Sequence, residues 1–168
     1  MAVHTTIASP LGDLLLVGQE SPTANGGLAL LSVSMPGQRN APVIPSGERP
    51  APAAFAEVER QFAAYFAGER QRFELEFAVR GTEFQQRVWG ALDAIPYGVT
   101  TSYGRLAEQI GLPRSAVRAV GGANGANPLL VVRPCHRVIG ANGALTGYAG
   151  GLDRKRALLQ HEGAGAAG

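Results

Sequence analysis

The first eighty residues alternate between apolar and polar positions in a way that predicts a sheet and one helix. Residues 4–20 (HTTIASPLGDLLLVGQE) predict two strands around a Ser-Pro-Leu-Gly turn, and residues 26–34 (GGLALLSVS) predict a third. Residues 35–52 are dense in Pro, Gly and polar residues, which predicts a mobile loop. Apolar residues then recur every three or four positions over 55–66, as in a helix. Strict alternation over 72–79 (RFELEFAV) predicts one more strand.

From residue 81 onward the pattern turns helical. Thr82 and Gln85 match a capping box, and the apolar stripe that follows is stopped by Pro96. Residues 101–111 and 114–125 predict two short helices joined by a turn that contains Gly and Pro. This pair has the outline of a helix-turn-helix, but most such pairs only pack together. Taken alone, it is weak evidence for DNA binding.

Composition narrows the class of protein. The chain has 168 residues, of which 45% are hydrophobic, so one domain or two small ones are expected. No apolar run approaches the ~20 residues of a membrane span, and the N-terminus does not resemble a signal peptide. A single cysteine excludes an internal disulfide and suits a reducing cytosol, so we expect a cytoplasmic protein. A net charge of +2 is too small to argue nucleic-acid binding from charge alone.

The cysteine, Cys135, stands in VVRPCHRVIG with His136 directly behind it. A lone cysteine after an apolar run is most often a small core residue. As a nucleophile it would need a base or a positive environment, because an isolated thiol has a pKa of about 8.5. As a zinc ligand it lacks partners, since only His4 and His161 remain and no ligand spacing is present. We therefore predict no metal site.

An ordered series of sequence motifs around Cys135 favours the nucleophile over a small core residue. It runs through GTEFQQRVW, NP, PCHRV, GYAGG and LLQHEG, spanning residues 81–163, with looser agreement in SPLGDLLL and FAAYFAGE. The series resembles the O6-alkylguanine-DNA alkyltransferase family. The resemblance implies an α/β fold class: a small ribonuclease H-like N-terminal α/β domain over 1–80, then a mostly helical catalytic and DNA-binding domain with a helix-turn-helix over 81–168.

The resemblance also implies catalytic roles. Cys135 would take the alkyl group, His136 would act as a base through a water molecule, and Glu162 would orient the imidazole. Asn127 corresponds to the hinge that ties the active-site segment to the recognition helix. Tyr103 would donate to guanine N3. Independent of the family, Glu162 lies at a predicted helix C-terminus, where the macrodipole disfavours a carboxylate, so a specific partner is expected.

The family binds its target in the minor groove and extrudes the damaged nucleotide. Arg118 would fill the space that the base leaves. The other residues that the resemblance places against DNA are Arg114, Ser115, Ala116 and Gly122. Those that it places around the base are Pro134, Val138, Tyr148 and Ala149.

The sequence departs from the family pattern at three points. Arg133 stands where relatives usually have an apolar residue, and we expect it to face solvent or a DNA phosphate. The turn GLPRS, residues 111–115, is one residue longer than usual. The glycines of GANG, residues 122–125, replace a position that is often basic in relatives. None of these changes removes a catalytic group.

The sequence therefore predicts a DNA-repair methyltransferase that moves the methyl group of O6-methylguanine in duplex DNA onto Cys135. Transfer would be irreversible, one event per molecule, without a cofactor and in a monomer. O4-methylthymine would be a weaker substrate. The alternative is a non-catalytic protein that recognises alkylated bases, although such relatives lack the cysteine. A transcription regulator would carry an extra cysteine-rich metal domain, and a Cys-His hydrolase would turn over repeatedly.

Overall fold

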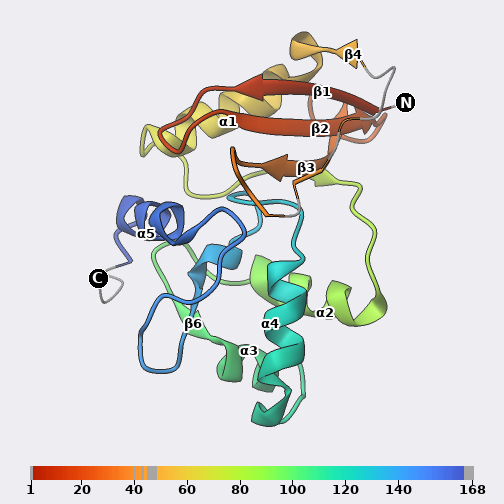
Figure 1. The fold of residues 1–168 in the computed structure, drawn as a ribbon. Helices are drawn as coiled ribbons and strands as arrows, with labels where there is room; N and C mark the ends of the chain where they lie inside the picture. Colours follow the sequence, from red (N-terminus) through yellow and green to blue (C-terminus); the bar gives the residue numbers. More distant parts are fainter. Residues whose placement is uncertain (1, 40, 43, 45–48, 165–168) are drawn as a thin grey trace. The chain divides into compact units, whose positions relative to one another are not determined.

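The computed structural model describes residues 2–39, 41–42, 44 and 49–164. The chain divides into two compact units, Met1–Val79 and Arg80–Gly168 (Figure 1). Within the described ranges, none of the helices is long and apolar enough to cross a membrane.

The first unit is built on a five-stranded sheet in the order β4-β1-β2-β3-β5 (Figure 1). The three long strands form an antiparallel meander, and the two short edge strands pair parallel to their neighbours. The strands are β1 (Ala2–Ile7), β2 (Leu14–Glu20), β3 (Leu28–Ser34), β4 (Arg49–Pro50) and β5 (Glu76–Phe77). The three strands predicted from the N-terminal pattern are thus confirmed.

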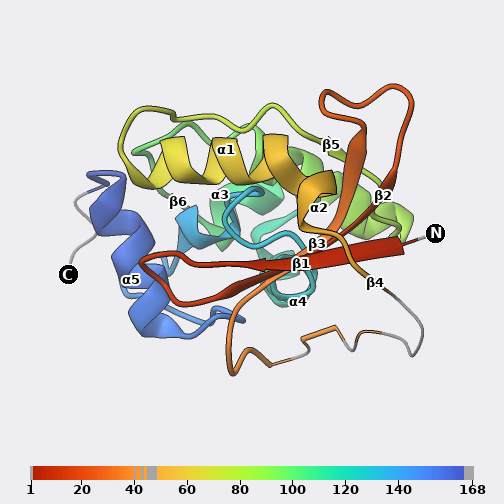
Figure 2. The ribbon, with the colours of Figure 1, turned by 90° about the horizontal axis from the view of Figure 1, so that it is seen from above.

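A single helix, α1 (Ala56–Phe66), lies along one face of this sheet (Figure 2). It buries Val58, Phe62 and Tyr65, which belong to the apolar stripe that predicted it. A short 3₁₀ turn, η1 (Pro52–Phe55), leads into the helix. The unit therefore has the α/β architecture that the sequence predicted.

The strand predicted over 72–79 is wrong for most of its length, because only β5 (Glu76–Phe77) forms. The backbone of Glu74 is engaged by a side chain instead of a neighbouring strand. Glu74 N–H donates to Gln61 Oε1 at 2.8 Å, and Gln61 Nε2 donates to Glu74 C=O at 3.1 Å. Gln61 is fully buried on α1, so it replaces the ladder at this position.

The loop predicted over 35–52 is wrong at its end, where β4 pairs with β1 through Val3 and Arg49. Pairing with a neighbouring strand can therefore give β4 a regular structure, although the local composition predicts a loop. Part of this prediction, at residues 40, 43 and 45–48, lies outside the described residues.

The second unit is mostly helical. Its helices are α2 (Glu83–Asp93), α3 (Tyr103–Gln109), α4 (Val117–Gly125) and α5 (Leu152–His161), with 3₁₀ turns η2 (Arg114–Ala116) and η3 (Cys135–Arg137). The predicted capping box is present, with Thr82 and Gln85 exchanging two hydrogen bonds of 3.0 Å. Trp89 Nε1 donates to Ala123 C=O at 2.9 Å and joins α2 to α4.

The helix pair α3 and α4 matches the two helices predicted from the sequence. Ser102 caps α3, and its side chain accepts from Arg105 N–H at 3.1 Å. Gly111 has a φ of 78°, which lets the chain turn sharply after α3. The second helix begins with the η2 turn before becoming regular at Val117.

Two short strands position the cysteine segment. β6 (Thr101–Ser102) pairs in parallel with β7 (Val138–Ile139), with Thr101 opposite Val138. β6 leads directly into α3, and η3 leads directly into β7. The pairing therefore brings the start of the helix pair beside the segment that carries Cys135.

Candidate functional site

Cys135 follows two tight backbone turns. Val132 N–H donates to Leu130 C=O at 2.8 Å, with Val131 between them at a φ of 70°. Cys135 N–H donates to Arg133 C=O at 2.7 Å across Pro134, whose φ and ψ of −79° and 53° fit an inverse γ-turn. A β-branched residue at positive φ is strained by roughly 1–3 kcal/mol. The surrounding contacts must hold this segment in place.

Asn127 supplies much of that support. Its Oδ1 accepts from Leu129 N–H at 3.1 Å and from Arg133 Nη1 at 3.3 Å. Its Nδ2 donates to Leu129 C=O at 3.2 Å and to Arg133 C=O at 3.5 Å. The same amide favours the thiolate of Cys135 and so lowers the pKa of the thiol, against the effect of burial. One buried amide thus holds both turns that precede the cysteine.

The thiol itself is nearly inaccessible, at 2% exposed. Burial raises the pKa of Cys135 to about 11, while the Asn127 hydrogen bond and the charges of Lys155 and Arg133 act in the opposite direction. The resting sulfur is therefore protonated at neutral pH. A nucleophilic reaction at this sulfur needs a group that takes the proton.

His136 is fully buried beside it in the chain, and its Nε2 lies 2.9 Å from Glu162 Oε2. Burial lowers the pKa of His136, and the hydrogen bond to Glu162 opposes that effect. A neutral imidazole that donates from Nε2 to the carboxylate keeps Nδ1 as an acceptor. Among the described residues, Nδ1 has no hydrogen-bond partner. The ring is thus arranged to accept a proton at Nδ1.

Glu162, at the C-terminal end of α5, also binds Arg137 through both carboxylate oxygens. Arg137 Nε lies 2.7 Å from Oε1 and Nη2 lies 2.9 Å from Oε2. Arg137 Nη1 donates further to Ile95 C=O at 2.6 Å. The partner expected for a carboxylate at a helix C-terminus is present, and it includes an arginine as well as the histidine. The sequence analysis assigned Arg137 no role, although it belongs to the PCHRV motif.

Lys155 was also missed. Its ammonium is fully buried and donates to the carbonyls of Val138 and Thr146 at 2.6 Å each and of Gly147 at 3.5 Å. These bonds join α5 to β7 and to the loop before α5. Burial lowers the pKa of Lys155 to about 8, and the charge of Cys135 opposes the shift. The available signal was that Lys155 is the chain's sole lysine.

Tyr103 is the first residue of α3, and its hydroxyl accepts from Thr146 Oγ1 at 3.2 Å. Its ring would lie 3.9 Å from a Cβ placed on Gly121, so α3 and α4 approach closely at this glycine. The residues expected around the base differ in burial. Pro134, Val138 and Tyr148 are buried, whereas Ala149 is half-buried.

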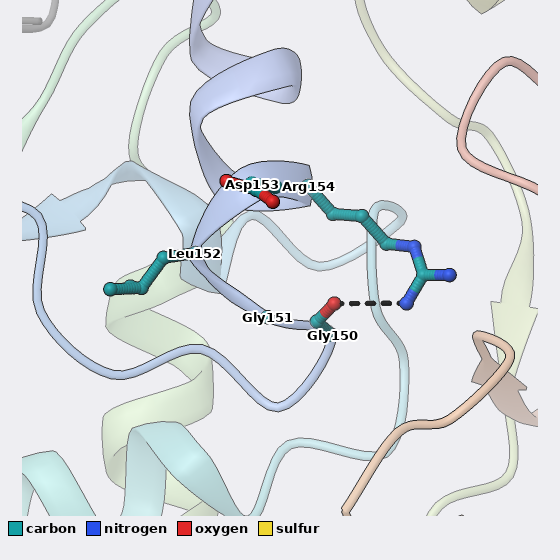
Figure 3. Close-up of a pocket in the computed structure, with 5 residues that line it drawn as sticks. All are labelled: Gly150, Gly151, Leu152, Asp153 and Arg154. Carbon is teal, nitrogen blue, oxygen red and sulfur yellow. Dashed lines mark hydrogen bonds between the residues drawn. The ribbon is translucent and has the colours of Figure 1, made fainter.

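A hollow opens directly after Ala149, at the start of α5 (Figure 3). Gly150, Gly151, Leu152, Asp153 and Arg154 line it. Leu152 and Arg154 point in opposite directions, and Arg154 Nη1 donates to Gly150 C=O at 3.0 Å (Figure 3). Gly151 has a φ of 95°, so the turn into the helix favours glycine. The hollow directly follows Tyr148 and Ala149, which are expected around the base.

The residues expected to touch DNA lie on η2 and α4. Arg114, Ser115, Arg118 and Gly122 are exposed, and Ala116 is half-buried. Arg114 pairs with Glu108, which is itself half exposed. Arg118 thus lies on a surface where a large partner can reach it, together with small side chains.

The expectation that Arg133 faces solvent or phosphate is wrong. The residue is 6% exposed, with its guanidinium 5.0 Å from the centre of the Trp89 ring. Its Nε lies 3.3 Å from Asp93 Oδ1 and its Nη1 lies 3.3 Å from Asn127 Oδ1. A planar, weakly hydrated guanidinium tolerates burial when an aromatic face, a carboxylate and an amide oxygen surround it.

No group of three His, Cys, Asp or Glu side chains in the described part of the chain could hold a metal ion. The charged and reactive groups around Cys135 are a thiol, an imidazole, two carboxylates and three buried cations.

Comparison with known proteins gives a consistent picture. Residues 83–164 match the family described as 6-O-methylguanine DNA methyltransferase, DNA binding domain, and residues 2–79 match its ribonuclease-like domain. The methylated-DNA–protein-cysteine methyltransferase of Mycobacterium tuberculosis is 51% identical over 96% of this chain and 93% of its own. The protein of that name from Methanosarcina acetivorans is 49% identical, over 95% and 97%.

Among solved structures, the Mycobacterium tuberculosis OGT in complex with DNA superposes with a TM-score of 0.86 at 52% identity. The match covers 95% of this chain and 92% of that chain. The similarity thus extends over both units.

Proposed function

Because this chain belongs to the 6-O-methylguanine DNA methyltransferase family, we propose that Cys135 is the residue that accepts the alkyl group. The protein is a DNA-binding methyltransferase that repairs O6-methylguanine by direct alkyl transfer. Within it, residues 80–168 carry both the chemistry and the DNA contacts. A transfer that leaves a thioether on Cys135 happens once per molecule, since no residue of the site can cleave a carbon–sulfur bond.

The observation that carries the proposal is the state of His136. Its Nε2 is fixed by Glu162, while its Nδ1 is buried and unpartnered among the described residues. Lowering of its pKa keeps the ring neutral, so it can take a proton from the thiol through one water molecule. The imidazolium that forms is stabilised by the Glu162 carboxylate, as in other base–carboxylate pairs.

The transfer then balances as follows. The sulfur of Cys135 attacks the methyl carbon, the sulfur–carbon bond forms, and the carbon–oxygen bond breaks with its electron pair on guanine. Tyr103 donates a proton to guanine N3 as charge develops on the base. The proton left on His136 returns through solvent to Tyr103. The base then releases the N3 proton to solvent and takes one up at N1, which gives the ordinary form of guanine. The net products are an S-methylcysteine and an unmodified guanine, and no cofactor is consumed.

Binding would follow the surface of η2 and α4. Because the methyl group lies inside the base stack, the nucleotide must leave the duplex at a cost of a few kcal/mol. Arg118 is exposed and can occupy the vacated space, and the small side chains of Ala116 and Gly122 suit close approach to a minor groove. The extruded base would lie against Pro134, Val138, Tyr148 and Ala149. We expect a monomer in the cytoplasm, with weaker activity on O4-methylthymine.

Mass spectrometry tests the proposal. Protein is incubated with a duplex that contains one O6-methylguanine, and the intact mass and the mass of the peptide holding Cys135 are measured. One methyl group should appear on that peptide for each lesion lost. Cys135→Ser should abolish transfer and retain DNA binding. Binding without a mass change in the unaltered protein would identify a recognition protein, and loss of many lesions per molecule would identify a turnover enzyme.

A further inference from the structure

Arg133 is a buried cation that has no role in the proposed transfer. It lies two residues before Cys135 and is 6% exposed. Its ion-pair partner Asp93 is 42% exposed, so the carboxylate remains partly in water while the guanidinium does not. Burying a charge in such a pair rarely stabilises a fold more than apolar side chains of similar volume would. Fold stability is therefore a poor account of an arginine here.

The contact with Asn127 gives a better account. A guanidinium carries donors only, so the Asn127 side-chain atom that faces Arg133 must be the oxygen. The Asn127 NH₂ group is then turned toward the backbone carbonyls of Leu129 and Arg133. In this orientation the amide lowers the pKa of the Cys135 thiol. With an apolar residue at 133, the oxygen would keep Leu129 N–H as a donor and lose the charged one.

We propose that Arg133 is a positioning residue for the alkyl transfer, which orients the Asn127 amide toward the Cys135 sulfur and places a positive charge beside the thiolate. The inference rests on the proposed role of Cys135 as alkyl acceptor.

The charges around the sulfur come from several elements. Lys155 on α5 and Arg133 on the turn both favour the thiolate. Asp93 on α2 faces Arg133 and offsets part of its charge. His136 and Arg137 on η3 face Glu162, and that carboxylate offsets their charge. Arg133 and Lys155 both lower the pKa of the thiol, so removal of Arg133 should be visible in the titration of the thiol.

The experiment compares Arg133→Met, Asp93→Asn and the double variant with the unaltered protein. Methionine keeps the length of the side chain and removes the charge and the donors. Because Cys135 is the only thiol, its alkylation by iodoacetamide across a range of pH reports on this site alone. Single-turnover methyl transfer from a duplex with one O6-methylguanine and the thermal midpoint are measured in parallel.

Arg133→Met should raise the apparent pKa of the thiol by about one unit and slow both reactions about tenfold, as expected for loss of a nearby opposite charge. Asp93→Asn leaves Arg133 and its contact with Asn127 in place, so the thiol pKa should stay or fall. Arg133→Lys keeps the positive charge but loses the planar guanidinium. Its thiol pKa and its reaction rates should lie between those of Arg133→Met and those of the unaltered protein.

A purely structural role predicts something else. The inference is overturned if Arg133→Met lowers the thermal midpoint but has the same thiol pKa and the same methyl-transfer rate as the unaltered protein. It is also overturned if Asp93→Asn raises the thiol pKa as much as Arg133→Met does. If Arg133→Met does not fold, the double variant, which leaves neither charge unpaired, decides by the same criteria. Failure of the unaltered protein to methylate Cys135 would instead overturn the proposed function.

Discussion

Glu162 serves two basic side chains at once. It fixes the Nε2 side of His136, and it balances the charge of Arg137, whose remaining donor reaches Ile95 C=O. All three side chains are buried, so each depends on the others for its hydrogen bonds. The proposed catalytic base and the stability of the second unit therefore both depend on the Glu162 carboxylate.

Replacing Glu162 with Gln should therefore destabilise the protein strongly. The buried Arg137 would lose its counter-charge, which typically costs about 3–5 kcal/mol in the free energy of unfolding. Glu108→Gln is the matched control, because it breaks a pair with Arg114 that is exposed and should cost less than about 1 kcal/mol. Urea denaturation measures both. Equal losses in the two variants would contradict the role given to burial.

The pH dependence of transfer follows from His136. Burial lowers its pKa below the ordinary value near 6.5, so the imidazole stays neutral at a pH where a solvated histidine is half charged. The single-turnover rate should hold down to pH 6.5 and decline only at lower pH. A decline centred at or above 6.5 would rule out this buried imidazole as the base.

The same lowered pKa has a consequence for stability. The unfolded chain binds the His136 proton near pH 6.5, whereas the native protein binds it only at lower pH. The free energy of unfolding should therefore fall as the pH drops from about 6.5 toward the native pKa of His136. Denaturation curves at several pH values should show this loss, and replacing His136 with Gln should remove its contribution.

At the scale of elements, α4 combines poor helix formers with an exposed surface. It carries Gly121, Gly122 and Gly125, although glycine in a helix costs roughly 0.5–1 kcal/mol relative to alanine. An added Cβ at Gly121 would make only ordinary van der Waals contact with the Tyr103 ring, at 3.9 Å. At Gly122 an added Cβ would meet nothing within 4 Å. Close approach of DNA is the reason that the proposed function supplies.

Gly122→Ala should therefore raise the stability of the protein and lower its affinity for DNA. The helix should gain about 0.5–1 kcal/mol in the free energy of unfolding. The affinity for duplex DNA should fall because the methyl group meets the groove. Gly90→Ala on α2 is the control, since Gly90 is also exposed and unobstructed, and only its stability should rise. Unchanged DNA affinity in Gly122→Ala would place the interface elsewhere.

At the scale of the whole molecule, the product of the reaction differs from the starting protein by one methyl group in a closed site. Residues 131–138 are all buried, and their path includes the strained Val131. Packed interiors respond to an added carbon by distortion, typically at a cost of about 1–3 kcal/mol. The repaired lesion should therefore leave behind a less stable protein.

Thermal and denaturant unfolding before and after complete reaction measure this effect. The methylated protein should unfold at a lower midpoint, by about 1–3 kcal/mol in the free energy of unfolding. Cys135→Ser, incubated with the same duplex and then separated from it, should show no change. Identical curves for the methylated and the free protein would mean that the site has room for the methyl group.

The sequence predicted most of what depends on near neighbours in the chain. The capping box of Thr82 and Gln85, the buried stripe of α1 and the two helices around Gly111 follow from spacings of one helical turn or from local turn chemistry. Where a local pattern competed with a tertiary contact, the contact prevailed. The alternation over 72–79 predicted a strand. The backbone N–H and C=O of Glu74 instead hydrogen-bond the Gln61 side chain, which lies 13 residues earlier on α1.

What the sequence by itself determined is the family, the three long strands, the main helices and the residue types of the site, because motifs and periodicities are local properties. Only the tertiary structure decided which charges meet. Arg137 and Glu162 stand 25 residues apart, and Arg133 and Asp93 stand 40 apart. No periodicity relates such positions. Their pairing follows from packing, since a buried charge is stable only where a partner of opposite charge or a hydrogen-bond acceptor is also buried.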